Sequence, residues 1–219
     1  MSDPLVYRRQ RQAMVEMQLE SRGIRAPKVL AAFRSVPRHE FVVPGDEPVA
    51  YQDRALPIGW GQTISQPFMV AYMLEMLAVE PHHQVLEVGA GSGYQAALLG
   101  QIASEVYSIE IVGELALRAE ATVSRLGYAN VYIVQGDGSL GYAAQAPYDR
   151  IVVAAGAPAI PEPLVSQLVE GGRLVIPLGD RGLQTCMVGV KREGELVVER
   201  GIGCVFVPLV GEKGWRAAC

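Results

Sequence analysis

The sequence predicts an α/β fold, with an open and mostly parallel sheet, helices on both of its faces and a short helical cap at the N-terminus. Three observations predict it. From residue 84 onward, short apolar runs of strand length alternate with segments of helix length. The stretch Gln84–Tyr94 passes from an apolar run through three glycines into a helical segment, the nucleotide-binding corner of open parallel sheets. Two longer strand-like runs, joined by Glu193-Gly194, then break the alternation.

The N-terminal part of the chain predicts helices and loops. Gly23 ends the first helix, and Pro27 opens the second. A later helix is nearly all apolar, so most of it is expected to be buried. The predicted elements are helices over 6–21 and 28–33, a loop over 38–51 and the apolar helix over 68–79, with a segment rich in glycine and proline over 56–66 before that helix.

The remainder predicts the sheet and its crossover helices. Glycines and prolines separate the apolar runs, as expected for strands and helices that follow each other closely. The predicted strands are 85–88, 106–110, 131–134, 151–154, 173–176, 184–190 and 196–207, and the helices are 94–102, 114–126 and 162–169. We expect a single domain, with a cap over 1–54, a catalytic core over 55–212 and a tail over 213–219 that is loose from Gly214 onward.

Composition and charge argue against several classes of protein. The chain has 219 residues, half of them hydrophobic, which is enough for one domain with a proper core. A net charge of −4 without a basic block argues against a nucleic-acid partner bound through phosphates. No apolar run has the length of a membrane span, and the polar, arginine-rich segment 1–14 is unlike a secretory signal. We expect a cytoplasmic protein, monomeric by default.

The cysteines and histidines predict neither a disulfide framework nor a metal site. Cys186, Cys204 and Cys219 are widely spaced and form no C-x-x-C pattern, so they are interpreted as reduced thiols of an intracellular protein. The three histidines have no metal-ligand spacing with acids or cysteines. We therefore expect no metal cofactor.

The glycine loop favours a particular kind of ligand. Glu87 stands two residues before Gly89, and Gly91 and Gly93 follow, whereas the third glycine of a dinucleotide fingerprint would fall on Tyr94. An acid in this place repels a pyrophosphate and suits a cationic ligand. The pattern resembles the S-adenosylmethionine (AdoMet) loop of class I methyltransferases. The alternative is a glycine-rich turn without a ligand.

Two further acids follow predicted strands at the same edge of the sheet. Glu110 lies 17 positions after Gly93 and is placed to accept hydrogen bonds from ribose hydroxyls, or else it is an ordinary acid at a helix start. Asp137 stands between Gly136 and Gly138, where it can accept from an exocyclic adenine amine or simply form an Asp-Gly turn.

Ser65 has a structural and a functional interpretation. It stands where the N-cap of the apolar helix is expected, with Pro67 in the first turn. The same position presents a hydroxyl beside backbone amides that favour an anion such as a carboxylate. The two interpretations are compatible.

Together these stretches resemble the protein-L-isoaspartate (D-aspartate) O-methyltransferases over nearly the whole chain. The matching pieces are 36–38, 41–42, 55–59, 62–67, 85–95, 108–110, 136–138, 148–153, 160–161, 167–168, 171–172 and 206–209. The glycine loop alone indicates a class I methyltransferase. Thr63-Ile-Ser-Gln-Pro67 and Phe206-Val-Pro-Leu209 are specific to this family. Trp60 stands where relatives often carry a polar residue, and the chain diverges after Leu209.

The resemblance implies a Rossmann-like class I methyltransferase fold, with seven strands and a reversed last strand. It implies methyl transfer from AdoMet to the free α-carboxylate of L-isoaspartyl residues in damaged proteins and peptides, with D-aspartyl residues left open. The methyl ester then starts repair through a succinimide. Ser65 is implied as the catalytic residue, and Ile64 and Ser65 as substrate contacts. The implied AdoMet contacts are Gln66, Glu87, Gly89, Gly91, Glu110, Gly136 and Asp137.

Two other functions stay open on the residues alone. One is AdoMet-dependent methylation of another carboxylate or of a small-molecule acceptor. The other is a non-catalytic module that binds AdoMet and a partner protein, against which the intact Ser65 and glycine loop argue. A carboxylate is already ionised at neutral pH, so its methylation needs no general base. The lack of a plausible His–acid pair in the sequence fits methylation of the isoaspartyl carboxylate, which the family resemblance implies.

Overall fold

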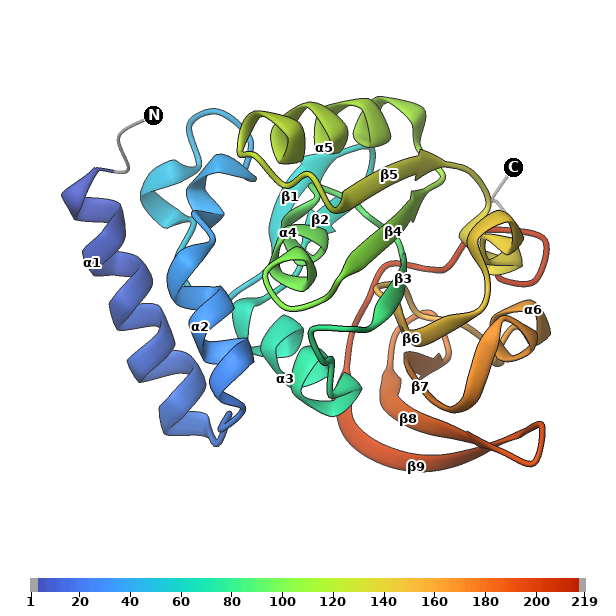
Figure 1. Ribbon diagram of the computed structural model, residues 1–219. Helices are drawn as coiled ribbons and strands as arrows, with labels where there is room; N and C mark the ends of the chain where they lie inside the picture. The colour runs from blue at the N-terminus through green and yellow to red at the C-terminus, as the bar shows by residue number, and fades with distance from the viewer. Residues whose placement is uncertain (1–3, 217–219) are drawn as a thin grey trace.

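A computed structural model describes residues 4–216 of the chain. Seven strands form one sheet in the order β5-β4-β3-β6-β7-β8-β9 (Figure 1). Their bounds are β3 Gln84–Val88, β4 Glu105–Glu110, β5 Val131–Gln135, β6 Tyr148–Val153, β7 Leu168–Gly179, β8 Gln184–Arg192 and β9 Glu195–Cys204. The chain runs outward from β3 to β5 and then returns to the other side of β3. This reversal leaves a crevice at the carboxyl end of β3.

The reversed strand is β8, the sixth in chain order, and the expectation of a reversed last strand was wrong in this detail. β8 is antiparallel to β7, and β9 is antiparallel to β8. Short connections join these strands, with the Glu193-Gly194 turn between β8 and β9. Two successive hairpins reverse the chain twice, so β9 runs in the same direction as the five parallel strands.

Helices cover the two faces of the sheet unequally. Side chains alternate between the faces, so Val85 packs into the larger hydrophobic cluster and Leu86 into the smaller one. The larger cluster contains α2, α3, α4 and α5, while the smaller contains the short α6. Helix bounds are α1 Leu5–Met14, α2 Pro27–Ser35, α3 Pro67–Leu77, α4 Tyr94–Gly100, α5 Gly113–Arg125 and α6 Glu162–Ser166. Short 3-10 turns, Gly138–Leu140 and Ala143–Gln145, connect β5 to β6 without a helix.

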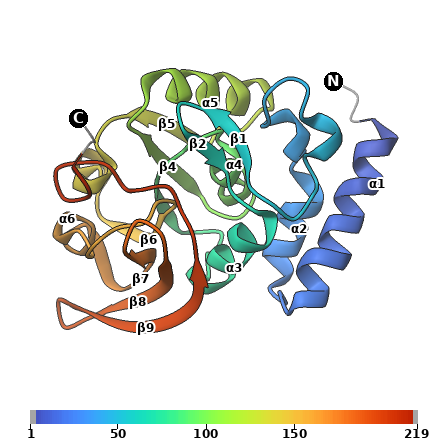
Figure 2. The same cartoon turned by 180° about the vertical axis from the view of Figure 1, so that it is seen from behind.

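The N-terminal helices pack on the sheet domain. α1 continues through a π-helical turn, Val15–Leu19, and a 3-10 turn, Glu20–Arg22, which ends at Gly23 with a φ of 98°. Figures 1 and 2 show α1 and α2 side by side at one end of the molecule, with α3 between them and the last strands. The buried apolar residues of both helices belong to the same cluster as those of α3 and α4, so the cap shares the main core. No helix among the described residues is long and apolar enough to cross a membrane.

A hairpin occupies the segment rich in glycine and proline, where the sequence predicted no strand. β1 Leu56–Gly59 pairs with β2 Gln62–Ile64 in a separate two-stranded sheet. The tip contains Trp60, which is 53% exposed and has a φ of 50°. The alternating burial of β1 shows why the prediction missed it: Leu56 and Ile58 are buried beside an exposed proline and glycine that are typical of turns.

Two boundaries near the C-terminus also differ from the expectation. α6 ends at Ser166, and residues 168–172, expected to be the end of a helix and a glycine pair, belong to β7. Within this part of β7, Gly171 has a φ of 77°, a backbone conformation that glycine adopts readily. Trp215 donates from its backbone nitrogen to Leu209 O at 2.7 Å and from Nε1 to Gly156 O at 3.0 Å, so the described part of the expected loose tail is anchored. Residues 217–219 of that tail lie outside the described residues.

Candidate active site

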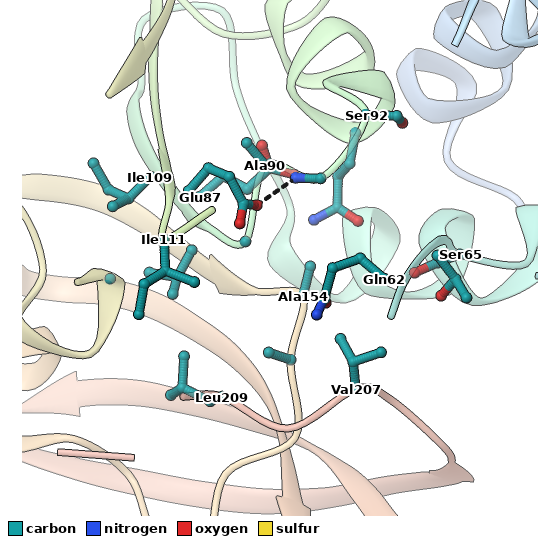
Figure 3. A pocket seen from close by; sticks show the side chains of 18 of the residues that line it. Gln62, Ser65, Glu87, Ala90, Ser92, Ile109, Ile111, Ala154, Val207 and Leu209 are labelled. Atoms are coloured by element: carbon teal, nitrogen blue, oxygen red, sulfur yellow. Dashed lines mark hydrogen bonds between the residues drawn. The ribbon is translucent and has the colours of Figure 1, made fainter. Parts of the chain in front are cut away.

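A cavity opens at the carboxyl ends of β3, β4 and β6. Its lining comes from the loops that follow these strands, from β2 and the residues after it, and from the segment 207–210 after β9. Figure 3 shows Gln62 and Ser65 on one side of this opening, with Glu87 and Ala90 above it and Val207 and Leu209 below. A cavity therefore lies at the edge of the sheet where the sequence predicted a ligand site. Segments distant in the sequence form part of its wall.

The glycine loop brings backbone to the cavity wall. Gly89, Gly91 and Gly93 have φ values of 95°, 54° and 85°, which residues other than glycine rarely adopt. A Cβ on Gly93 would also lie 3.2 Å from a methyl group of Val123, so this turn packs closely on α5. Gly89 and Gly91 line the cavity as expected, while Gly93 caps the start of α4. The spacing thus builds a tight strand-to-helix turn whose backbone faces the cavity.

Glu87 carries a carboxyl group that is fully buried at the cavity wall. Burial raises its pKa to about 8, a hydrogen bond from Ser108 opposes the shift, and the nearby charge of Glu110 adds to it. Ser108 Oγ donates to Oε2. Oε1 is buried and has no hydrogen-bond partner within the described chain. A buried oxygen without a donor is unfavourable, so this site is built for a ligand that supplies a proton donor or a positive charge.

Glu110 organises the loops on the other side of the cavity. Its Oε2 accepts from Gly91 N at 2.8 Å, and its Oε1 accepts from Val112 N at 3.0 Å. The side chain belongs to the cavity lining, although the residue is only 5% exposed. Each carboxylate oxygen has a second lone pair, so Glu110 can still accept from hydroxyl groups of a ligand. The alternative of an ordinary helix-start acid accounts for only the Val112 contact.

Asp137 and Gly136, both expected as cofactor contacts, are not among the residues that line the cavity. Asp137 Oδ1 accepts from Ser139 N at 2.9 Å, which is the Asp-Gly turn chemistry considered for this position. Its Oδ2 accepts from Glu212 N at 2.7 Å. Gly138 lines the cavity instead. Asp137 thus fastens the C-terminal segment beside the cavity.

Ser65 lies at the cavity, but it is not the N-cap of α3. The N-cap is Gln66, without a side-chain cap bond, and Phe68 N donates to Asp53 Oδ1 at 3.3 Å. A carboxylate from another loop therefore takes the place at the helix N-terminus that the sequence assigned to Ser65. The Ser65 hydroxyl has no hydrogen-bond partner among residues 4–216, which leaves it available to a substrate.

Arg38 holds the backbone of Ser65 from within the core. The residue is fully buried, and its Nη2 donates to Ser65 O at 2.8 Å while Nε donates to Ala50 O at 2.7 Å. The guanidinium lies over the Tyr94 ring, 4.9 Å from its centroid, and burial lowers the pKa of Arg38. A buried arginine that bonds two backbone oxygens is costly to misplace. Val36-Pro-Arg38 was noted in the sequence, but nothing in its pattern indicated this contact.

A second cavity adjoins the first. Both are lined by Thr63, Ser65, Ala154 and Val207, so the two cavities lie side by side along these four residues. Ile64, expected as a substrate contact, lines the first cavity. Gln66, expected as a cofactor contact, lines the second and donates from Nε2 to Asp53 Oδ2 at 2.8 Å.

The wall formed by residues 207–210 is the largest part of the site that sequence reasoning left without a role. Leu209 N donates to Gly156 O and Gly156 N donates to Val207 O, both at 2.8 Å. These bonds attach the segment to the loop after β6. The Phe206-Val-Pro-Leu209 motif marked the segment as distinctive, but its place beside the glycine loop depends on the order of strands in the sheet.

The first cavity fits AdoMet. Its buried acid with an unpartnered oxygen suits the cationic amino acid end, and the glycine turn allows close backbone contact. Glu110 offers acceptors for ribose hydroxyls, and Ile109, Ile111 and Leu209 offer apolar surface for a base. Among the described residues, no group of three or more His, Cys, Asp and Glu side chains could hold a metal ion.

Known proteins resemble this chain along most of its length. A family model for protein-L-isoaspartate(D-aspartate) O-methyltransferase matches residues 9–214. A relative from Methanoculleus marisnigri, named protein-L-isoaspartate O-methyltransferase, is 52% identical over 209 residues, covering 95% of each chain. A relative of the same name from Methanoregula boonei is 48% identical over 217 residues, covering 99% of this chain and all of the other.

Solved structures agree with these relatives. One named protein-L-isoaspartate O-methyltransferase has a TM-score of 0.86 at 30% identity, covering 93% of this chain and 67% of the other. A Plasmodium falciparum structure, proposed to be a protein of this kind and in complex with S-adenosyl-L-homocysteine, has a TM-score of 0.79 at 25% identity, covering 90% and 96%. Length, identity and fold lead to one conclusion: the chain belongs to the protein-L-isoaspartate(D-aspartate) O-methyltransferase family.

Proposed function

We propose that this protein transfers the methyl group of AdoMet to the free α-carboxylate of L-isoaspartyl residues in proteins and peptides. The single observation that supports this best is the pair of cavities that lie side by side along Thr63, Ser65, Ala154 and Val207. One cavity suits a cationic nucleoside, and the other leaves room for a peptide. A methyl group can pass between two bound molecules only where their cavities meet.

The reaction requires little acid–base chemistry from the protein. An α-carboxylate has a pKa of about 3.5, so it is an ionised nucleophile at neutral pH. One carboxylate oxygen forms a bond to the methyl carbon as the carbon–sulfur bond breaks, and the electron pair of that bond stays on sulfur. AdoMet supplies the activated methyl group as a sulfonium. The protein therefore acts by orienting the carboxylate and by excluding water.

The residues divide this work between them. Ser65 donates its free hydroxyl to the substrate carboxylate, while Arg38 fixes the backbone that carries it. Glu87 binds the cationic end of the cofactor, and Glu110 binds the ribose while it holds Gly91. We propose these roles for this chain, with Ile64 as part of the wall near the substrate.

A direct assay tests the function. Purified protein is incubated with tritiated AdoMet and two peptides that are identical except for one L-isoaspartyl or one normal aspartyl residue, and base-labile methyl groups are counted. Label on the isoaspartyl peptide alone is the expected result. Label on neither peptide, with AdoMet binding confirmed by calorimetry, contradicts the proposal and favours another acceptor. A D-aspartyl peptide in the same assay decides whether this second substrate is accepted.

The ester product connects the proposed activity with protein repair. The carbonyl of the methyl ester is more electrophilic than that of a carboxylate, and its methoxy group can leave. The neighbouring amide nitrogen therefore attacks this carbonyl, its proton leaves with the methoxy group as methanol, and a succinimide forms. Hydrolysis of the succinimide returns part of the material to normal aspartate, which amounts to protein repair. We further propose that the chain works as one domain, with 1–54 as a cap on the core 55–212, and that it acts as a cytoplasmic monomer without a nucleic-acid partner. Light scattering of the purified protein tests the oligomeric state.

A further inference from the structure

The carboxylate of Asp53 accepts three hydrogen bonds from two separate parts of the chain, the end of the N-terminal helical segment and the start of α3. Oδ2 accepts from Gln66 Nε2 at 2.8 Å and from Arg22 Nη1 at 2.6 Å, and Oδ1 accepts from Phe68 N at 3.3 Å. Gln66 Nε2 also donates to the backbone oxygen of Asp53 at 3.1 Å. Arg22 ends the N-terminal helical segment, and its guanidinium carbon lies 3.5 Å from the centroid of the Phe68 ring. Asp53 therefore ties the cap to the start of α3.

These contacts bracket Ser65. Gln66 follows it directly, and Phe68 lies in the first turn of α3. On the other side, Arg38 donates to the carbonyl oxygen of Ser65 itself. The hydroxyl of Ser65 makes no bond to the described chain that could fix its direction. Its orientation therefore depends on backbone held by Arg38 on one side and by Asp53 on the other.

An ordinary helix cap does not account for this arrangement. A cap requires only the contact to Phe68 N, which is the longest of the set. The ion pair with Arg22 is partly exposed, with 44% and 24% of the two side chains accessible, so solvent screens it. The two bonds from Gln66 lie outside the helix and hold the side chain of a residue at the second cavity. These two bonds are the contacts expected if Asp53 positions residues of the site.

We propose that Asp53 is a positioning residue, which orients Ser65 toward the substrate carboxylate through its bonds to Gln66 and the start of α3. This proposal rests on the proposed function, because it concerns the same methyl transfer. The proposal gives Asp53 no contact with the reacting atoms, because it lines the second cavity but not the first and its oxygens accept from Gln66, Arg22 and Phe68. A small displacement of an orienting group is enough to lower turnover by about 100-fold, so the effect is expected in kcat.

Two substitutions separate positioning from capping. Asp53→Ala removes every acceptor on the side chain. Asp53→Asn keeps one oxygen that can accept from Gln66 Nε2, but its amide nitrogen then faces Phe68 N and gives that N–H no acceptor. Both variants are expected to melt at a lower temperature than the wild type. Glu47→Ala serves as the matched control, because it removes one acid from the same loop, where Glu47 contacts Gly45 N.

The variants are compared by kcat and KM with an L-isoaspartyl peptide, by AdoMet affinity in calorimetry and by thermal melting. We expect Asp53→Ala to lower kcat at least about tenfold, with AdoMet affinity within about twofold, and Asp53→Asn to restore kcat to within about threefold of wild type. Glu47→Ala should match the wild type. Equal losses of kcat in the alanine and asparagine variants, no loss in either, or a parallel loss of AdoMet affinity would each overturn the proposal.

A further variant keeps the test decisive if Asp53→Ala does not fold. Gln66→Leu removes the bonds from Gln66 and leaves the carboxylate free to cap α3. We expect it to melt near the wild-type temperature with a kcat at least about tenfold lower, and wild-type turnover would overturn the proposal. The wild-type protein reports separately on the proposed function: if it fails to methylate the isoaspartyl peptide, that function fails before any variant is compared.

Discussion

The buried acid at the cofactor cavity predicts that cofactor binding releases a proton. Burial raises the pKa of Glu87 to about 8, and one of its oxygens has no partner in the described chain. The group is therefore mostly protonated at neutral pH in the empty protein. A cationic ligand beside it favours the carboxylate, so binding lowers its pKa and releases the proton.

The magnitude follows from the pKa. At pH 7, a group with a pKa of about 8 is ionised in about one molecule in ten, so binding releases about 0.9 proton and carries a cost of about 1.4 kcal/mol. At pH 9 the group is already mostly ionised and this cost is almost gone. The Glu87 contribution to the affinity for AdoMet is therefore expected to rise by up to about tenfold between pH 7 and pH 9, while loss of the positive charge on the ligand's own amino group opposes it over the same range.

Calorimetry in two buffers of different ionisation enthalpy measures the proton release directly. The amino group of AdoMet titrates in the same range, so Glu87→Gln is measured in parallel as the control that keeps the ligand's own titration. The wild type should release about 0.9 proton more than the variant at pH 7. Equal release by the two proteins would refute the reasoning, because it would mean that Glu87 is ionised before the ligand arrives or stays neutral afterward.

Three further predictions concern other parts of the site. Ser65→Ala should lower kcat about tenfold or more and leave AdoMet affinity within about twofold, because the proposed contact of the hydroxyl is with the substrate alone; equal losses in both would contradict this role. Glu110→Ala should weaken AdoMet binding at least about tenfold in calorimetry, since it removes charged acceptors from the ribose and from Gly91, and unchanged affinity would count against it. Asp137→Ala should speed amide hydrogen exchange at Glu212 about fivefold by removing the acceptor of its N–H, whereas unchanged protection would show that other bonds hold the segment.

The sequence was sufficient for the parts of the site that depend on local chemistry. The apolar run before Gly89 and the positive-φ glycines after it determine a strand, a turn and a helix within a few residues of each other. Glu87 and Glu110 end up at one cavity because parallel strands present their carboxyl ends at one edge. Periodicity and turn chemistry decide such features without knowledge of the rest of the fold.

The features that the sequence missed depend on contacts between distant segments. Ser65 looked like a helix cap because its own neighbours satisfy the pattern, but Asp53 comes from another loop to take that place. Asp137 follows a strand, and nothing near it in the sequence indicated that Glu212 N, from the other end of the chain, would donate to its carboxylate. The reversal of β8 depends on the two short connections before and after it, whereas the resemblance implied reversal of the last strand.

The wall built by residues 207–210 has a consequence for the order in which the protein matures on the ribosome. The glycine turn, Glu87 and Glu110 are translated well before Val207, and they can form their strands and turns first. The cavity stays open on one side until the segment after β9 emerges and bonds to Gly156. A nascent chain that stalls before this segment therefore has the acids proposed to bind the cofactor but lacks the wall that closes the cavity, so the ability to keep a bound cofactor should appear only when this segment is in place.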